Sequence, residues 1–231
     1  MISHKHEVLF VHIPKCGGQS IESLFLNDLK YGWKERAVLG LGPNRSELIG
    51  PPRLAHLLYK DYLSKGFIGK RQLENYFSFG IIRDPLDRVV SMYNYLQFSF
   101  FESLKSRAQI LKILRGSPFL NMSFNTFINN WLPTQFGYQN DTSHAHRNMY
   151  WFVRPQSDFI MSESNMKPLT ILRFDEINAI QRRLIGDYSL NSTIVHANVS
   201  KAKKFSRANL TEKHISAIKN LYHDDFILYG K

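Results

Sequence analysis

A short apolar segment that runs into a double glycine is the feature that most constrains how this sequence can fold. Residues 7–13 have the composition of a strand, and Pro-Lys-Cys-Gly-Gly-Gln-Ser follows at 14–20. Helical periodicity begins at Gln19, so the glycines stand where a helix starts. Backbone N–H groups at a helix N-terminus attract anions, and Gly17 and Gly18 let a ligand approach without a Cβ in the way. The segment therefore predicts a phosphate-binding strand–loop–helix unit.

Two polar side chains complete the predicted loop. Lys15 supplies a cation and Ser20 supplies a hydroxyl donor. A nucleotide P-loop, G-x-x-x-x-G-K-[ST], places its lysine directly after the last glycine. Here Lys15 precedes both glycines, so that motif is absent. The alternative interpretation is an ordinary strand-to-helix turn, in which the glycines only permit the bend.

The rest of the chain alternates strands with helices. Further strands are expected at 37–41, 76–82 and 169–174, and helices at 19–30, 56–65, from Pro85, within 99–135, at 176–185 and from Thr211. Loops are expected at 42–53, 136–156 and 189–209. This alternation predicts an α/β fold with a central, mostly parallel sheet flanked by helices. Because no linker or repeat interrupts it, we expect a single domain over 1–231.

A second motif, Arg-Asp-Pro-Leu-Asp-Arg-Val-Val-Ser, occupies 83–91 directly after a predicted strand. Asp84 can cap the next helix, and Pro85 suits its first turn. The planar guanidinium of Arg83 suits bidentate binding of a phosphate. Ligands of parallel sheets sit at the carboxyl ends of the strands, so we expect Lys15 and Arg83 to line one pocket.

Both motifs resemble those of the carbohydrate sulfotransferases, which use 3′-phosphoadenosine 5′-phosphosulfate (PAPS). The segment 12–20 is similar to their 5′-phosphosulfate loop, and 83–91 is similar to their 3′-phosphate motif. Four later segments look like landmarks of the membrane-type enzymes and their bacterial relatives: 155–157, 173–176, 196–201 and 222–226. The resemblance implies a PAPS-dependent O-sulfotransferase of polysaccharide biosynthesis, with a P-loop-like loop and no metal.

The resemblance also implies roles for individual residues. The 5′-phosphosulfate is expected on the loop residues Pro14, Lys15, Cys16, Gly17, Gly18, Gln19 and Ser20. The 3′-phosphate is expected on Arg83 and Ser91, and the segment with Ser200 and Lys201 is expected to help close over the cofactor. Lys15 is expected near the bridging oxygen, where it stabilises the charge that develops on the leaving group.

The acceptor hydroxyl needs a general base, for which His56 is the first choice. An unperturbed histidine pKa suits proton transfer near neutral pH. His144 and His146 are the rivals, and His12 is expected to be structural. Irregular segments hold further candidates for binding an anionic glycan acceptor, namely Arg53, Arg147 and Arg154 with His144 and His146.

The net charge of +11 indicates an anionic partner without saying which one. A P-loop kinase or phosphotransferase is one alternative, but it needs a lysine after the glycines. A non-catalytic binder of anionic polymers is another, although no nucleic-acid module or basic stripe with stacking aromatics is found. We therefore expect no nucleic-acid partner, and the resemblance implies a glycan or other hydroxyl acceptor, which can be anionic.

The single cysteine, Cys16, excludes an internal disulfide and fits a reducing compartment. We expect it to pack beneath the loop and not to act as a nucleophile. No stretch approaches the ~20 apolar residues that span a bilayer, and the N-terminus has no apolar signal core. These features predict a bacterial cytoplasmic enzyme or, alternatively, the catalytic domain of a Golgi lumenal protein.

Overall fold

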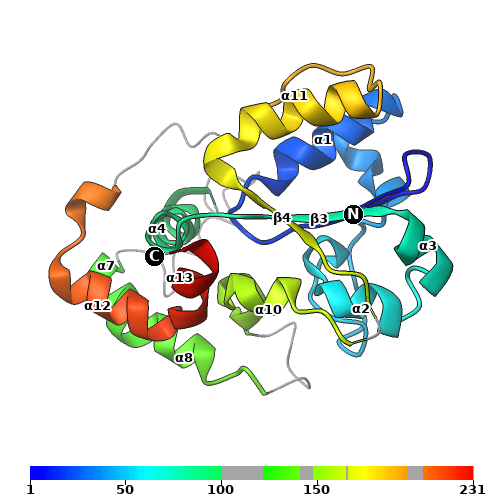
Figure 1. The fold of residues 1–231 in the computed structure, drawn as a ribbon. Coiled ribbons are helices and arrows are strands. Elements are labelled where there is room, and N and C mark those ends of the chain that lie inside the picture. Colours follow the sequence, from blue (N-terminus) through cyan, green and yellow to red (C-terminus); the bar gives the residue numbers. More distant parts are fainter. Residues whose placement is uncertain (100–121, 141–147, 165, 197–204, 231) are drawn as a thin grey trace, which may run out of the picture. The chain divides into compact units, whose positions relative to one another are not determined.

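The computed structural model describes residues 1–99, 122–140, 148–164, 166–196 and 205–230. The chain divides into two compact units (Figure 1). The first combines Met1–Arg83 with Tyr138–Asn198, and the second combines Asp84–Gly137 with Val199–Lys231. Each unit buries apolar side chains of its own.

The first unit is built on a sheet with the strand order β1-β2-β3-β4. The strands are β1 (Ile2–Ser3), β2 (Val8–Val11), β3 (Phe77–Ile82) and β4 (Thr170–Arg173). β1 pairs antiparallel with β2, whereas β2–β3 and β3–β4 are parallel. The central strands carry the core, where the rings of Phe10 and Phe79 lie 4.9 Å apart. The predicted fold class, a mostly parallel sheet flanked by helices, is confirmed.

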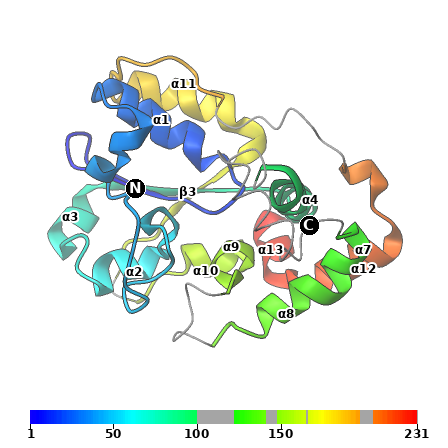
Figure 2. The same cartoon turned by 180° about the vertical axis from the view of Figure 1, so that it is seen from behind.

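Helices cover both faces of this sheet (Figures 1 and 2). α1 (Gly18–Asp28) and α11 (Ile177–Asp187) lie side by side on one face, and α2 (Tyr59–Ser64) and α10 (Gln156–Ile160) lie on the other. Shorter elements complete the unit: η1 (Trp33–Leu39), η2 (Leu54–His56), α3 (Lys70–Asn75), α9 (Tyr150–Val153) and η5 (Phe174–Glu176).

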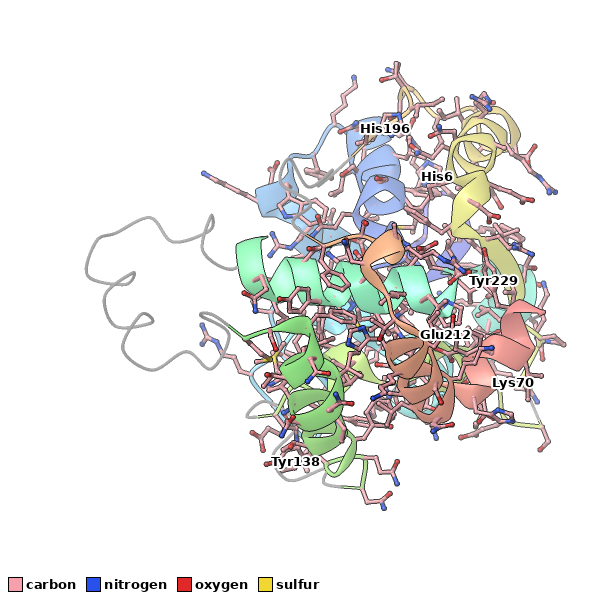
Figure 3. All side chains as sticks on the ribbon, turned by 90° about the vertical axis from the view of Figure 1, so that its left-hand side faces the viewer. His6, Lys70, Tyr138, His196, Glu212 and Tyr229 are labelled. Atoms are coloured by element: carbon pink, nitrogen blue, oxygen red, sulfur yellow. The ribbon has the colours of Figure 1, made fainter. Side chains whose placement is uncertain are left out.

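His6, labelled in Figure 3, links the β1–β2 turn to the end of α1. Its Nε2 lies 2.9 Å from Asp28 Oδ2, and its Nδ1 lies 2.6 Å from Ser3 Oγ. The His6 ring also packs edge-on against Phe25, 5.2 Å between centroids. These contacts hold the first strand pair against the helix that begins at the glycine loop.

The elements that the structure describes in the second unit are all helical. They are α4 (Pro85–Asn94), η3 (Tyr95–Ser99), α7 (Phe124–Thr126), η4 (Phe127–Trp131), α8 (Leu132–Phe136), η6 (Arg207–Asn209), α12 (Glu212–Leu221) and α13 (His223–Tyr229). Asp84 caps α4 by accepting from the Leu86 and Asp87 N–H groups, as its sequence predicts. The buried Arg88 Nη1 lies 3.7 Å from Asp225 Oδ2 and ties α4 to α13.

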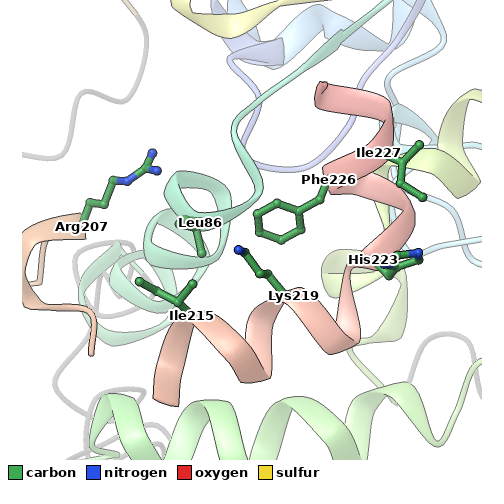
Figure 4. Close-up of a pocket in the computed structure, with 7 residues that line it drawn as sticks. All are labelled: Leu86, Arg207, Ile215, Lys219, His223, Phe226 and Ile227. Carbon is green, nitrogen blue, oxygen red and sulfur yellow. The ribbon is translucent and has the colours of Figure 1, made fainter. Parts of the chain in front are cut away.

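A hollow of about 320 Å³ opens between α4, α12 and α13 of this second unit (Figure 4). Four apolar side chains line it, namely those of Leu86, Ile215, Phe226 and Ile227. Its basic lining residues are Arg207, Lys219 and His223. Arg207 is already engaged with Asp84 and Asp87, at 2.9 and 3.4 Å. None of the predicted site residues that the structure describes lines this hollow.

Three expected segments are corrected by the structure. The strand expected at 37–41 is wrong, because the chain forms η1 there, with Glu35 bonded to the Gly32 N–H and Gly40 in the left-handed region (φ 70°). The helix expected at 56–65 begins only at Tyr59, because Leu57 and Leu58 are buried in extended conformations. The loop expected at 136–156 contains α9.

Other boundaries agree within a few residues, and α11 continues through Gly186 to Asp187. Most of the helical region expected within 99–135 lies at 100–121, outside the described residues. In the part of the chain that the structure describes, no helix has the length and apolarity needed to cross a membrane. The expectation of a single domain over 1–231 remains a prediction.

Candidate active site

The loop between β2 and α1 has the backbone of a tight turn. Lys15 and Gly17 both have left-handed φ angles, 70° and 80°, and Gly17 is the N-cap of α1. The Ser20 N–H donates to Gly17 O at 3.0 Å, so the helix is established within one turn of the loop. N–H groups at the start of a helix lack the carbonyl partner four residues earlier, which is why a helix N-terminus can bind an anion.

Both glycines are required by side chains that pack against them. A Cβ on Gly18 would lie 2.1–2.4 Å from ring atoms of His12, and one on Gly17 would lie 2.8 Å from Cε2 of Phe174. The His12 ring is held in turn, because its Nδ1 lies 2.6 Å from Glu22 Oε1 and both side chains are buried. The loop therefore has room only for backbone at these two positions.

Arg83 lies directly beside the loop. Its Nη1 donates to Lys15 O at 3.2 Å, and its guanidinium carbon lies 4.5 Å from the centroid of the Phe174 ring. Burial and, secondly, the nearby Arg83 charge lower the pKa of Lys15 to about 8. Two cations held together at a helix N-terminus favour an anion between or beside them.

Cys16 is buried beneath the loop, 1% exposed, with Sγ 3.2 Å from Gln156 Oε1. Burial of this kind is typical of a packing role. Of the other loop residues, Pro14, Gly18 and Ser20 are buried and Gln19 is half-buried.

His56 is held in one tautomer by its surroundings. Its Nδ1 lies 3.1 Å from His12 O, and a carbonyl only accepts, so Nδ1 carries the proton and Nε2 the lone pair. The ring stacks on Trp151 at 5.3 Å between centroids. Burial, with smaller contributions from His12 and Arg53, holds the pKa of His56 well below 6.5. His56 is therefore neutral near pH 7 with its lone pair on Nε2, but it is a weaker base than the unperturbed histidine on which the sequence-based choice rested.

Of the remaining predicted residues, three are described and five are not. Arg154 is engaged locally, with Nε 3.3 Å from Asp158 Oδ2 and the guanidinium over the Tyr150 ring. Arg53 is exposed, and Ser91 is half-buried on α4 of the second unit. Five predicted site residues lie outside the described residues: His144, His146, Arg147, Ser200 and Lys201.

Sequence reasoning missed four side chains that build the site: Glu22, Trp151, Gln156 and Phe174. Phe174 follows the end of β4 as Arg83 follows the end of β3, and this position was an available signal. Gln156 belongs to a segment noted only as a landmark, and it had no assigned role. Glu22 and Trp151 carry no such local signal, because their partners are set by packing.

Comparison with known protein families shows which family the chain belongs to. The model described as "Sulfotransferase family" matches residues 1–231, the whole chain. The chain belongs to the sulfotransferase family. The resemblance of the chain to the sulfotransferases is thereby confirmed as membership of sulfotransferase family 2, and the roles of 12–20 and 83–91 stay predictions. No curated protein and no solved structure gave a significant match to this sulfotransferase.

Proposed function

We propose that this sulfotransferase uses PAPS to sulfate a hydroxyl of a carbohydrate acceptor. The observation that carries the proposal is the pair Lys15 and Arg83, held together where α1 begins. Family membership supports PAPS as the donor. Arg83 binding a phosphate in addition to that of the loop would distinguish PAPS from ATP or AMP.

The residues of the site supply three functions to the reaction. The donor carries the sulfuryl group on its 5′-phosphate and, when bound, supplies an S–O bond that breaks as the acceptor oxygen attacks sulfur. The loop N–H groups orient the phosphosulfate, and Lys15 stabilises the charge that develops on the bridging oxygen. His56 Nε2 accepts the acceptor's hydroxyl proton, so the products are the sulfate ester and adenosine 3′,5′-bisphosphate.

Thermal unfolding with three ligands tests this proposal. Adenosine 3′,5′-bisphosphate, AMP and ATP with Mg²⁺ are compared at the same excess. We expect a clear rise in Tm with the bisphosphate alone, because a ligand that binds only the folded protein stabilises it by about 2.7 kcal/mol at a hundredfold excess over Kd. A shift with ATP and Mg²⁺ alone would favour a phosphotransferase. No shift with any of them would favour a binder of anionic polymers.

His56→Ala is expected to lower kcat by about 10²–10⁴-fold, the usual contribution of a general base. The affinity for the bisphosphate should change little, because His56 contacts the His12 carbonyl and not the loop glycines. Turnover is followed with labelled PAPS and a panel of glycans. His223→Ala, an exposed histidine of the second unit, is the control and should keep full activity. Near-normal turnover of His56→Ala would exclude it as the base and direct the same test to His144 and His146.

A further inference from the structure

The buried side-chain amide of Gln156 connects the loop that carries Lys15 to the end of the strand that carries Arg83. Gln156 begins α10 and is 0% exposed. Its Oε1 accepts from the Arg83 N–H at 2.8 Å and from Cys16 Sγ at 3.2 Å. Its Nε2 donates to Arg83 O at 2.9 Å. The side chain thus bonds to both backbone groups of Arg83 and to the middle of the loop.

The amide takes the place of a neighbouring strand at Arg83. β3 ends at Ile82, whose partner in β4 is Arg173, so Arg83 is the first residue past the sheet. Gln156 offers one donor and one acceptor side by side, which matches the C=O and N–H of a single residue. A buried backbone group left without such a bond costs about 1–3 kcal/mol. This pairing therefore fixes the direction in which Arg83 leaves the strand.

Together with one further hydrogen bond, these contacts form a closed cycle of four residues: Gln156, Arg83, Lys15 and Cys16. Arg83 Nη1 donates to Lys15 O, Lys15 is bonded through the chain to Cys16, and Cys16 Sγ returns to Gln156. The backbone of Arg83 and the loop at Cys16 cannot shift without disturbing a contact of the buried amide. We propose that Gln156 is the positioning residue that couples the glycine loop to Arg83, so that the two phosphates of the donor are bound as a unit. The identity of those phosphates rests on the proposed function.

A change at Gln156 should therefore weaken binding that uses both cations more than binding that uses the loop alone. We expect Gln156→Met, of similar length but without hydrogen-bonding groups, to raise the Kd for adenosine 3′,5′-bisphosphate by about 10–100-fold. The Kd for AMP, which lacks the 3′-phosphate, should rise clearly less.

The chain provides a matched control in Gln181. This second glutamine lies on α11 and is also 0% exposed. Its Oε1 accepts from the Val195 N–H at 2.8 Å, and its Nε2 donates to Val195 O at 3.2 Å. Gln181→Met should lose comparable stability but change neither Kd by more than about twofold, because it touches neither the loop nor Arg83. If Gln156→Met does not fold, Gln156→Glu keeps the shape and an acceptor, but it replaces the donor to Arg83 O with a carboxyl oxygen. A bisphosphate Kd equal to that of the wild type in a folded Gln156 variant would overturn the proposal.

A ligand-free measurement separates this inference from the proposed function. Cys16 is the single cysteine, so its reaction with a thiol reagent reports on the loop alone. Loss of the Gln156 contact should speed labelling of native protein at least about tenfold, whereas Gln181→Met should not. Equal labelling rates in both variants would overturn the coupling. Fast labelling in a protein that does not prefer the bisphosphate over AMP would instead uphold the coupling and contradict the proposed function.

Discussion

Lys15→Met is expected to lower kcat by about 10²–10³-fold and to stabilise the folded protein at pH 7. The rate falls because the cation at the bridging oxygen acts where charge develops in the transition state. The stability rises because burial and Arg83 both disfavour the charged form of Lys15. Methionine is about as long as lysine and, like lysine, has an unbranched side chain at this left-handed position. The wild type and Lys15→Met therefore differ chiefly in charge.

The size and pH dependence of this stabilisation follow from the pKa of Lys15. It is about 8 in the folded protein and 10.5 in the absence of perturbation. Between these values the unfolded chain binds more protons, so the contribution of Lys15 to stability rises with pH over this window. Below pH 8 the full cost of burying the charged Lys15 side chain is present. We expect the free energy of unfolding of Lys15→Met to exceed that of the wild type by about 1–3 kcal/mol there. The difference from wild type should vanish above about pH 10.5.

Denaturant unfolding from pH 6 to 10.5 measures this gain, and bisphosphate titrations over the same range measure binding. Wild-type affinity should start to fall as the pH passes about 8, where Lys15 of the free protein loses its proton. Lys15→Met should not show this fall in bisphosphate affinity above pH 8. Lys34→Met, at an exposed lysine, is the control and should change neither property. A Lys15→Met protein with wild-type turnover would remove Lys15 from the mechanism.

Gly18→Ala is expected to destabilise the first unit by about 3 kcal/mol or more. The new methyl group would lie 2.1–2.4 Å from the His12 ring, which is pinned by the buried Glu22. Either the ring loses its carboxylate partner or α1 shifts, and both overpacking and the breaking of a buried pair are costly. The same shift should also abolish bisphosphate binding, because α1 carries the loop.

Gly186→Ala is the matched control for this change. A Cβ on Gly186, within α11, meets nothing within 4 Å, so alanine should stabilise the helix by about 0.5–1 kcal/mol. Urea unfolding of both variants gives the comparison, with an unchanged m-value as the check that unfolding stays two-state. The double variant Gly18→Ala/His12→Ala should recover part of the loss. Equal stability of Gly18→Ala and Gly186→Ala would mean that His12 does not pack on the loop.

Short-range chemistry determined much of this protein from its sequence alone. The glycines at 17 and 18, the Asp84 and Thr211 caps and the alternation of apolar segments each act within a few residues, so their consequences can be read locally. Together they predicted the fold class, the loop and the meeting of Lys15 and Arg83 at adjacent strand ends, which the parallel pairing of β2 and β3 produces.

Only the tertiary structure decided what holds these groups in place. Gln156 lies 73 residues from Arg83 and 140 from Cys16 along the chain, and Trp151 reaches His56 across a similar gap. The segment 37–41 has the composition of a strand, but residues 37–39 belong to the helical turn η1. Val38 does not pack into the core there, and it is 49% exposed. Partners at such separations depend on how the layers pack, and packing is a property of the whole chain and not of any short pattern.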